Sequence, residues 1–179
     1  LNHLIDVIIV AKLGERKLDL RKNGGLLEEF EFINARPLLY SVGGLKEKPV
    51  LNGARNEVRW TSPELNPKQQ ITAPQEATHF QFLLVAATVS HYVYEPDRKG
   101  YVAVEPTFRN CSAFTESEPL ALAQKAIGSV TLQLNLPEKV VVPNEVAVVS
   151  AVGVRFLKNV NGELLEVEDA GGMRVFGVG

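Results

Sequence analysis

The chain has 179 residues, of which 45% are hydrophobic and 22% are charged, a composition that suits one folded domain with a full core or two small ones. Its 19 Lys and Arg stand against 21 Asp and Glu, so there is no basic excess to neutralise phosphates, and we expect no nucleic-acid binding. The single cysteine, Cys111, excludes an internal disulfide framework and a cysteine-rich zinc site.

The first segment carries apolar residues at helical spacing, which favours a helix with one buried face: Leu1, Leu4, Ile5, Ile8 and Ile9. The β-branched residues of "DVIIV" leave a strand as the alternative. This apolar run is too short to span a membrane, and it lacks the basic start and the cleavage site of a signal peptide. We predict an N-terminal helix or extension over residues 1–25 and a single β-sandwich domain over residues 26–179. The sequence does not indicate the cellular compartment.

Alternating apolar and polar residues predict strands in the first half of the domain. In "FEF", Phe30 and Phe32 are expected to face the core, while the glutamate between them faces water. Residues 34–56 are rich in glycine and proline and indicate loops, with one short strand at "PLLYSV". In "EVRWTS", Val58 and Trp60 share one face, and Trp60 is expected in the core.

The longest regular stretch is "THFQFLLVAATVSHYVYEP", residues 78–96. It begins with alternation and becomes apolar on both faces in "LLVAATV", as expected for a strand that is buried on both sides. The segment "YVAVEPTF", residues 101–108, is its expected hairpin partner, and a turn at residues 96–100 would join the two.

Strand patterns also dominate the C-terminal half. The exception is "SEPLALAQKAIG", residues 117–128, a helix candidate with a capping serine, an early proline and a closing glycine. The segments "VTLQLNL" and "EVAVVSAVGVRFL" are predicted strands. Residues 152–179 suggest a three-stranded meander with turns at the Asn-Gly and Gly-Gly pairs. A two-residue Asn-Gly turn would place Arg155 opposite Glu168 as a cross-strand charge pair.

About eight to ten strands against one or two short helices make this a mainly β chain. Long helices do not alternate with the strands, so a parallel α/β sheet is not expected. We predict an antiparallel β-sandwich, immunoglobulin/fibronectin-like or jelly-roll-like, with one or two short helices. Its core should contain one set of inward-facing residues: Val130, Leu132, Leu134, Phe80, Phe82 and Phe156.

No pattern in the sequence marks a catalytic, cofactor or metal site, and none is predicted. His79 and His91 would lie about 40 Å apart on one unbroken strand, too far to share a metal ion. Ser150 lies within an apolar strand and Cys111 has no histidine near it in sequence, so both are interpreted as structural. The clustered glutamates near both ends of the domain are interpreted as the water-facing sides of strands.

Three tyrosines form the strongest candidate for a binding site. Tyr92, Tyr94 and Tyr101 gather around the turn at residues 96–100, and the first two share one face of their strand. Exposed rings at the rim of a sandwich can stack on sugars or anchor a protein partner. The alternative is that these rings cover the end of the core or pair across the hairpin.

Two segments, "APQEATHFQFLLVAA" and "AVGVRFLKNVNGELLEVEDAGGMRVFGV", resemble parts of an uncharacterised β-sandwich protein family of Bacteroidota-type bacteria. The resembling motifs are the entry to a long strand and a hairpin near the end of the chain. The resemblance implies a bacterial origin and a β-sandwich, and it implies no function and no site residues.

The leading functional hypothesis is a non-enzymatic module that binds or assembles with another protein, either a partner or a further copy in a homo-oligomer. The second hypothesis is a carbohydrate-binding module that uses Tyr92, Tyr94 and Tyr101. The third is a hydrolase whose site is not visible in the sequence. No cofactor is expected.

Overall fold

The computed structural model describes residues 17–33, 35–109, 111–137 and 140–179. The predicted N-terminal helix therefore lies outside the described residues, and the domain boundary near residue 25 stays a prediction. Within the described residues the chain is mainly β, and every strand pair is antiparallel. The helices are short: α2 (Leu20–Asn23), α3 (Leu38–Ser41) and α4 (Pro67–Gln70), with 3₁₀ turns η1 (Gly24–Leu26) and η2 (Pro106–Phe108).

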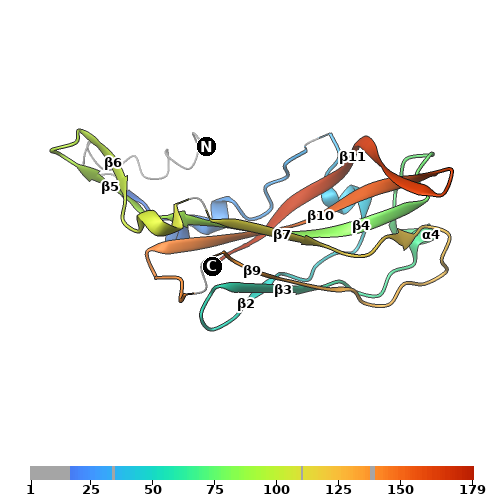
Figure 1. Ribbon diagram of the computed structural model, residues 1–179, viewed down its shortest axis with the longest axis horizontal. Helices are drawn as coiled ribbons and strands as arrows, with labels where there is room; N and C mark the ends of the chain where they lie inside the picture. Colours follow the sequence, from blue (N-terminus) through green and yellow to red (C-terminus); the bar gives the residue numbers. More distant parts are fainter. Residues whose placement is uncertain (1–16, 34, 110, 138–139) are drawn as a thin grey trace.

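Two sheets pack against each other, which confirms the predicted antiparallel β-sandwich (Figure 1). The larger sheet has the order β11-β10-β4-β7, and β8 also pairs with β4. Its strands are β4 (His79–Ser90), β7 (Ser112–Glu116), β8 (Leu120–Ala121), β10 (Val146–Val160) and β11 (Glu163–Val178). The smaller sheet has the order β2-β3-β9, with β2 (Val50–Leu51), β3 (Glu57–Thr61) and β9 (Thr131–Asn135).

A third, small sheet extends beyond one end of the sandwich (Figure 1). It has the order β1-β5-β6, with β1 (Lys17–Leu18), β5 (Tyr92–Glu95) and β6 (Gly100–Ala103). The β5–β6 hairpin confirms the predicted pairing across the turn at residues 96–100. The single long strand predicted over residues 78–96 is wrong, because the chain passes from β4 in one sheet to β5 in another at His91.

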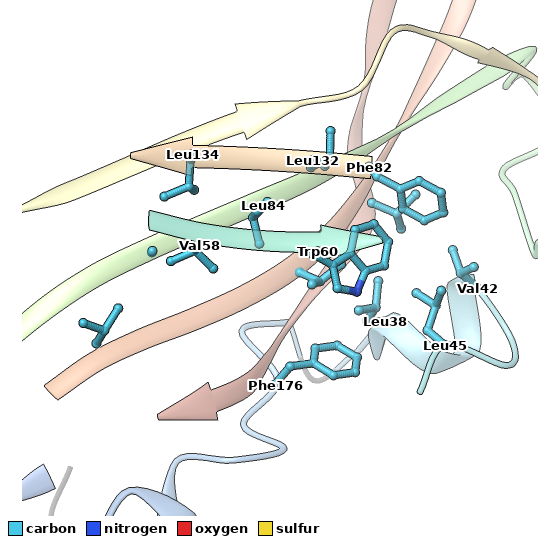
Figure 2. Packing of buried hydrophobic residues seen from close by; sticks show 14 of the residues in the cluster. Leu38, Val42, Leu45, Val58, Trp60, Phe82, Leu84, Leu132, Leu134 and Phe176 are labelled. Carbon is cyan, nitrogen blue, oxygen red and sulfur yellow. The ribbon is translucent and has the colours of Figure 1, made fainter. Parts of the chain in front are cut away.

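The core lies between the five-stranded and three-stranded sheets (Figure 2). Alternation sets the inward faces: Val58 and Trp60 of β3 are buried, as are Leu132 and Leu134 of β9. The predicted core set is confirmed, since five of its members are fully or nearly fully buried in one cluster and Val130 packs against it. The rings form edge contacts, with 5.2 Å between the centroids of Trp60 and Phe82. Such contacts fix ring orientation and add to the energy of burial.

The short strand predicted at "PLLYSV" is instead the helix α3. Leu38 and Val42 point into the core from this segment, at the spacing of one helical turn (Figure 2). The helix lies unusually close to β11: a Cβ on Gly172 would lie 2.8 Å from the Arg36 carbonyl oxygen and 2.9 Å from the Leu38 Cα. Only glycine at this position allows the two backbones to approach in this way.

The helix predicted over residues 117–128 is wrong. Within this segment Leu120–Ala121 forms β8 beside β4, Ile127 forms an isolated β-bridge with Leu65, and the rest is turn or loop. The Ser117 hydroxyl, expected to cap a helix, instead accepts a hydrogen bond from the Phe82 backbone N–H at 3.0 Å. The Ser117 side chain therefore pairs with β4 in the place of a backbone group. It is not available as an N-cap, on which the helix prediction depended.

The predicted three-stranded meander at the C-terminus is also wrong, because β10 and β11 form one long hairpin. The turn at Asn161-Gly162 is confirmed, with φ of 54° and 93°, the positive values that an Asn-Gly hairpin turn requires. The second pair, Gly171 and Gly172, lies inside β11 and makes no turn. A register shift between Arg155 and Leu157 places Gly171, and not Glu168, opposite Arg155.

Candidate functional site

The structure brings the three predicted tyrosines onto one face of the β5–β6 hairpin. Tyr94 and Tyr101 are cross-strand partners whose ring centroids lie 5.5 Å apart in an edge-to-face arrangement. Tyr92 lies two residues from Tyr94 on the same face and pairs with Leu18 of β1 on its other side. Tyr101 is 43% exposed, whereas Tyr92 and Tyr94 are half-buried.

This tyrosine face lies on the hairpin that extends past the end of the sandwich (Figure 1). None of the three rings belongs to the buried cluster of the core; Tyr94 and Tyr101 pair across the hairpin, and Tyr92 lies opposite Ala103. Their hydroxyls and partly open ring faces offer a surface that is apolar in the middle and polar at the tips. Whether this surface binds a ligand stays a prediction.

A second candidate surface was not found by sequence reasoning. It is the outer face of the five-stranded sheet, the side that points away from β2, β3 and β9. Register defines two rows of side chains across it. The first row runs Val175, Ala151, Val85 and Phe114, and the second runs Met173, Gly153, Leu83 and Glu116. Apart from Glu116 at one edge, these rows hold no charged side chain.

Residues 29–32 extend this face by one further chain at the edge of β11. The Phe32 N–H donates to the Met173 carbonyl at 2.9 Å, and the Val175 N–H donates to the Phe30 carbonyl at 2.9 Å. The two phenylalanines therefore lie beside the rows, with ring centroids 5.3 Å apart, and they are 52% and 57% exposed. The prediction that Phe30 and Phe32 face the core is wrong.

Glu31 explains this reversal. It forms a β-bridge with Arg174, and its carboxylate lies 3.5 Å from that guanidinium and accepts a hydrogen bond of 2.9 Å from the Leu38 N–H. The glutamate side chain therefore points inward, where its partners are, and alternation sends Phe30 and Phe32 outward. Sequence alternation alone could not reveal this, because the partner is nearly a whole chain length away.

Both ends of the outer face are closed. At one end Arg155 forms a 2.7 Å ion pair with Glu116 and donates a 3.0 Å hydrogen bond to Gln81. At the other end α2 and η1 pack over β10 and β11, and a Cβ on Gly24 would lie 2.5 Å from the side chain of Val178. Between these ends, Ala151, Gly153 and Val175 are buried, and Leu83, Val85 and Met173 are partly exposed.

The outer face has small and aliphatic side chains in its middle, a part that we call the valley, and phenylalanines at its two edges. Its middle is made of small and well-packed residues, with Ala151 5% and Val175 3% exposed. Its edges carry Phe30 and Phe32 on one side and Phe114, 72% exposed, on the other. Exposed phenylalanines at both edges of an apolar sheet are typical of a surface that is covered in the functional state.

Two hollows elsewhere carry no comparable arrangement. A cleft of about 250 Å³ beside β11 contains Lys48 and Glu28, paired at 2.7 Å, and Arg174 and Glu29, paired at 3.2 Å. These four charged side chains therefore form two ion pairs with one another. A shallow groove of about 500 Å³ lies beside α3 and is bordered by the exposed ring of Tyr40.

The residues considered for catalysis or metal binding stay apart. His79 and His91 lie at opposite ends of β4, where His79 contacts the Thr78 hydroxyl and His91 lies 2.9 Å from the Asp19 carboxylate. Ser150 is buried and donates to a carbonyl of β11, and the Cys111 thiol donates to the Thr107 carbonyl. Among the described residues, no three His, Cys, Asp or Glu side chains gather closely enough to hold a metal ion.

No protein-family model matches the chain, and no curated protein is similar to it in sequence. None of the helices in the described ranges is long and apolar enough to cross a membrane.

Proposed function

We propose that this protein is a non-enzymatic module that binds or assembles with another protein through the outer face of its five-stranded sheet. The observation that carries the proposal is the exposure of Phe30, Phe32 and Phe114 around an apolar valley. Exposed aromatic rings are costly in water, and folded chains keep apolar patches exposed chiefly where a partner covers them.

The architecture of the face supports this role. The valley is built on β4 and β10, the two central strands of the sheet, and it therefore offers a rigid, preformed surface. Rigid surfaces bind with little loss of conformational freedom, and buried aromatic anchors supply most of the energy in many interfaces. The polar rim formed by Arg155 and Glu116 is the usual border of such a surface.

We expect the purified chain to associate with itself or to capture a partner from its native host, and the charge-introducing variant Phe114→Arg to lose most of this binding. Phe114 is exposed, so the substitution should leave the fold intact. Light scattering over a concentration series and affinity capture measure the two forms of binding. The matched control is Asn135→Arg, an exposed position on β9 in the other sheet. A strictly monomeric chain that captures nothing would overturn the proposal.

A second candidate function is carbohydrate binding by the tyrosine face, favoured by the convergence of Tyr92, Tyr94 and Tyr101 on one side of the projecting hairpin. Aromatic faces stack on the apolar faces of sugar rings, and hydroxyls beside them bind the sugar hydroxyls.

If this function is correct, a glycan array will show binding, and Tyr94→Ala will weaken it by at least tenfold because it removes the central ring. Tyr40→Ala is the matched control, since this tyrosine is exposed on a different part of the molecule. Binding to no glycan, or binding unaffected by Tyr94→Ala, would rule out this use of the face.

A further inference from the structure

We propose that the partner for the outer face is a second copy of this chain, so that two five-stranded sheets stack face to face across a twofold axis. This inference rests on the proposed function and adds the identity of the partner and the geometry of the pair.

The shape of the face suits another twisted sheet. Two sheets that pack face to face keep their strand directions within about 30° of each other, and the side chains of the two faces interdigitate. Small side chains in the middle of a face leave room for this close approach, while large ones at its margins add contact area. The outer face has this distribution, with Ala151 and Gly153 in the middle and phenylalanines at both edges.

Twofold symmetry makes the two edges complementary. A twofold axis in the interface and parallel to the strands places each edge of one copy over the opposite edge of the other. Phe30 and Phe32 of one copy would then meet Phe114 of the second copy, and the same contact would form again on the other side. Each aromatic edge is thereby covered by an aromatic edge, which favours edge-to-face ring contacts.

The area is sufficient for a weak but specific dimer. At about 200 Å² for a phenylalanine ring, the exposed fractions of Phe30, Phe32 and Phe114 amount to about 350 Å². With the partly exposed aliphatic residues of the valley, each copy would bury on the order of 500 Å². The pair would bury about 1,000 Å², the lower bound for a specific interface. We therefore expect association that depends on concentration.

The test combines light scattering with photo-cross-linking on the full chain. Wild-type protein should pass from monomer to dimer as its concentration rises. Phe114→Arg and Phe30→Arg should each raise the dissociation constant by at least tenfold, whereas Asn135→Arg should leave it unchanged. Circular dichroism and urea midpoints equal to wild type, measured at a concentration where wild type is monomeric, establish that the variants are folded.

A photo-reactive benzoylphenylalanine at position 114 then identifies what covers the face. Links between two copies that map to residues 26–33 support the inference. Links within one copy to residues 1–16 overturn it, because that segment of the same chain would then be the cover. A dimer that is insensitive to both arginine substitutions also overturns it.

The failure of this inference can be told apart from the failure of the proposed function. A monomeric chain that captures a different protein, and loses it in Phe114→Arg, keeps the proposed function and refutes the second copy as partner. If the chain is monomeric, captures no protein and forms no cross-link from position 114, both the proposed dimer and the proposed function are refuted.

Discussion

Replacing Phe82 with alanine is expected to lower the free energy of unfolding by about 3–5 kcal/mol. Phe82 is fully buried at the centre of β4, and its ring contacts the rings of both Trp60 and Phe80. The neighbours belong to both sheets of the sandwich, so they cannot close over the space that the ring leaves, and a cavity remains.

Urea unfolding, compared at a constant m value, measures this loss. Phe114→Ala is the matched control, because it removes the same ring from the exposed side of the same sheet and should change the stability by no more than about 0.5 kcal/mol. A loss below about 1 kcal/mol in Phe82→Ala would mean that the inward face of β4 has been assigned wrongly.

Arg55→Met is expected to cost about 2–4 kcal/mol, although a methionine retains most of the apolar stem. The Arg55 guanidinium donates to the carbonyl oxygens of Pro143 at 2.7 Å, Val146 at 2.6 Å and Gly179 at 2.7 Å, and also reaches Val142 at 3.3 Å. These carbonyls lie in the loop before β10, at the start of β10 and just after β11. The Arg55 side chain thus joins a loop of the smaller sheet to the β10–β11 hairpin of the larger sheet.

Burial lowers the pKa of the Arg55 guanidinium, and the nearby positive charge of Arg21 lowers it further. The hydrogen bonds to the backbone oxygens of Pro143, Val146 and Gly179 offset this cost. Arg55→Lys is the informative second variant, since one ammonium cannot reach acceptors spread over this span, and we expect it to recover less than half of the loss. Equal stability of the lysine variant and wild type in urea unfolding would show that the positive charge, and not the planar geometry of the guanidinium, stabilises the fold.

Much of the fold could be predicted because it depends on local patterns. The Asn161-Gly162 turn is encoded by two adjacent residues that tolerate positive φ, and the strands around Trp60 and Leu132 are encoded by alternation. These signals require no knowledge of distant residues. The tyrosine face could be anticipated for the same reason, because a short turn determines which residues of a hairpin lie opposite one another.

The features that could not be predicted depend on distant partners. Phe30 and Phe32 face outward because Glu31, between them, forms an ion pair with Arg174. Ser117 lies beside β4 because its hydroxyl accepts a hydrogen bond from the Phe82 N–H. The expected pairing of Arg155 with Glu168 failed because of a bulge, which local alternation does not reveal. The outer face was missed for the same reason, since its rows exist only when register between four strands is known.

The pairing of residues 29–32 with β11 also sets an order of events during synthesis. Residues 29–32 are made well before β11, so one edge of the outer face cannot form until β11 has been made. A nascent chain that stops short of β11 therefore lacks the aromatic edge formed by Phe30 and Phe32. Recognition through this face would then select chains in which β11 is complete, because only these present both edges at once.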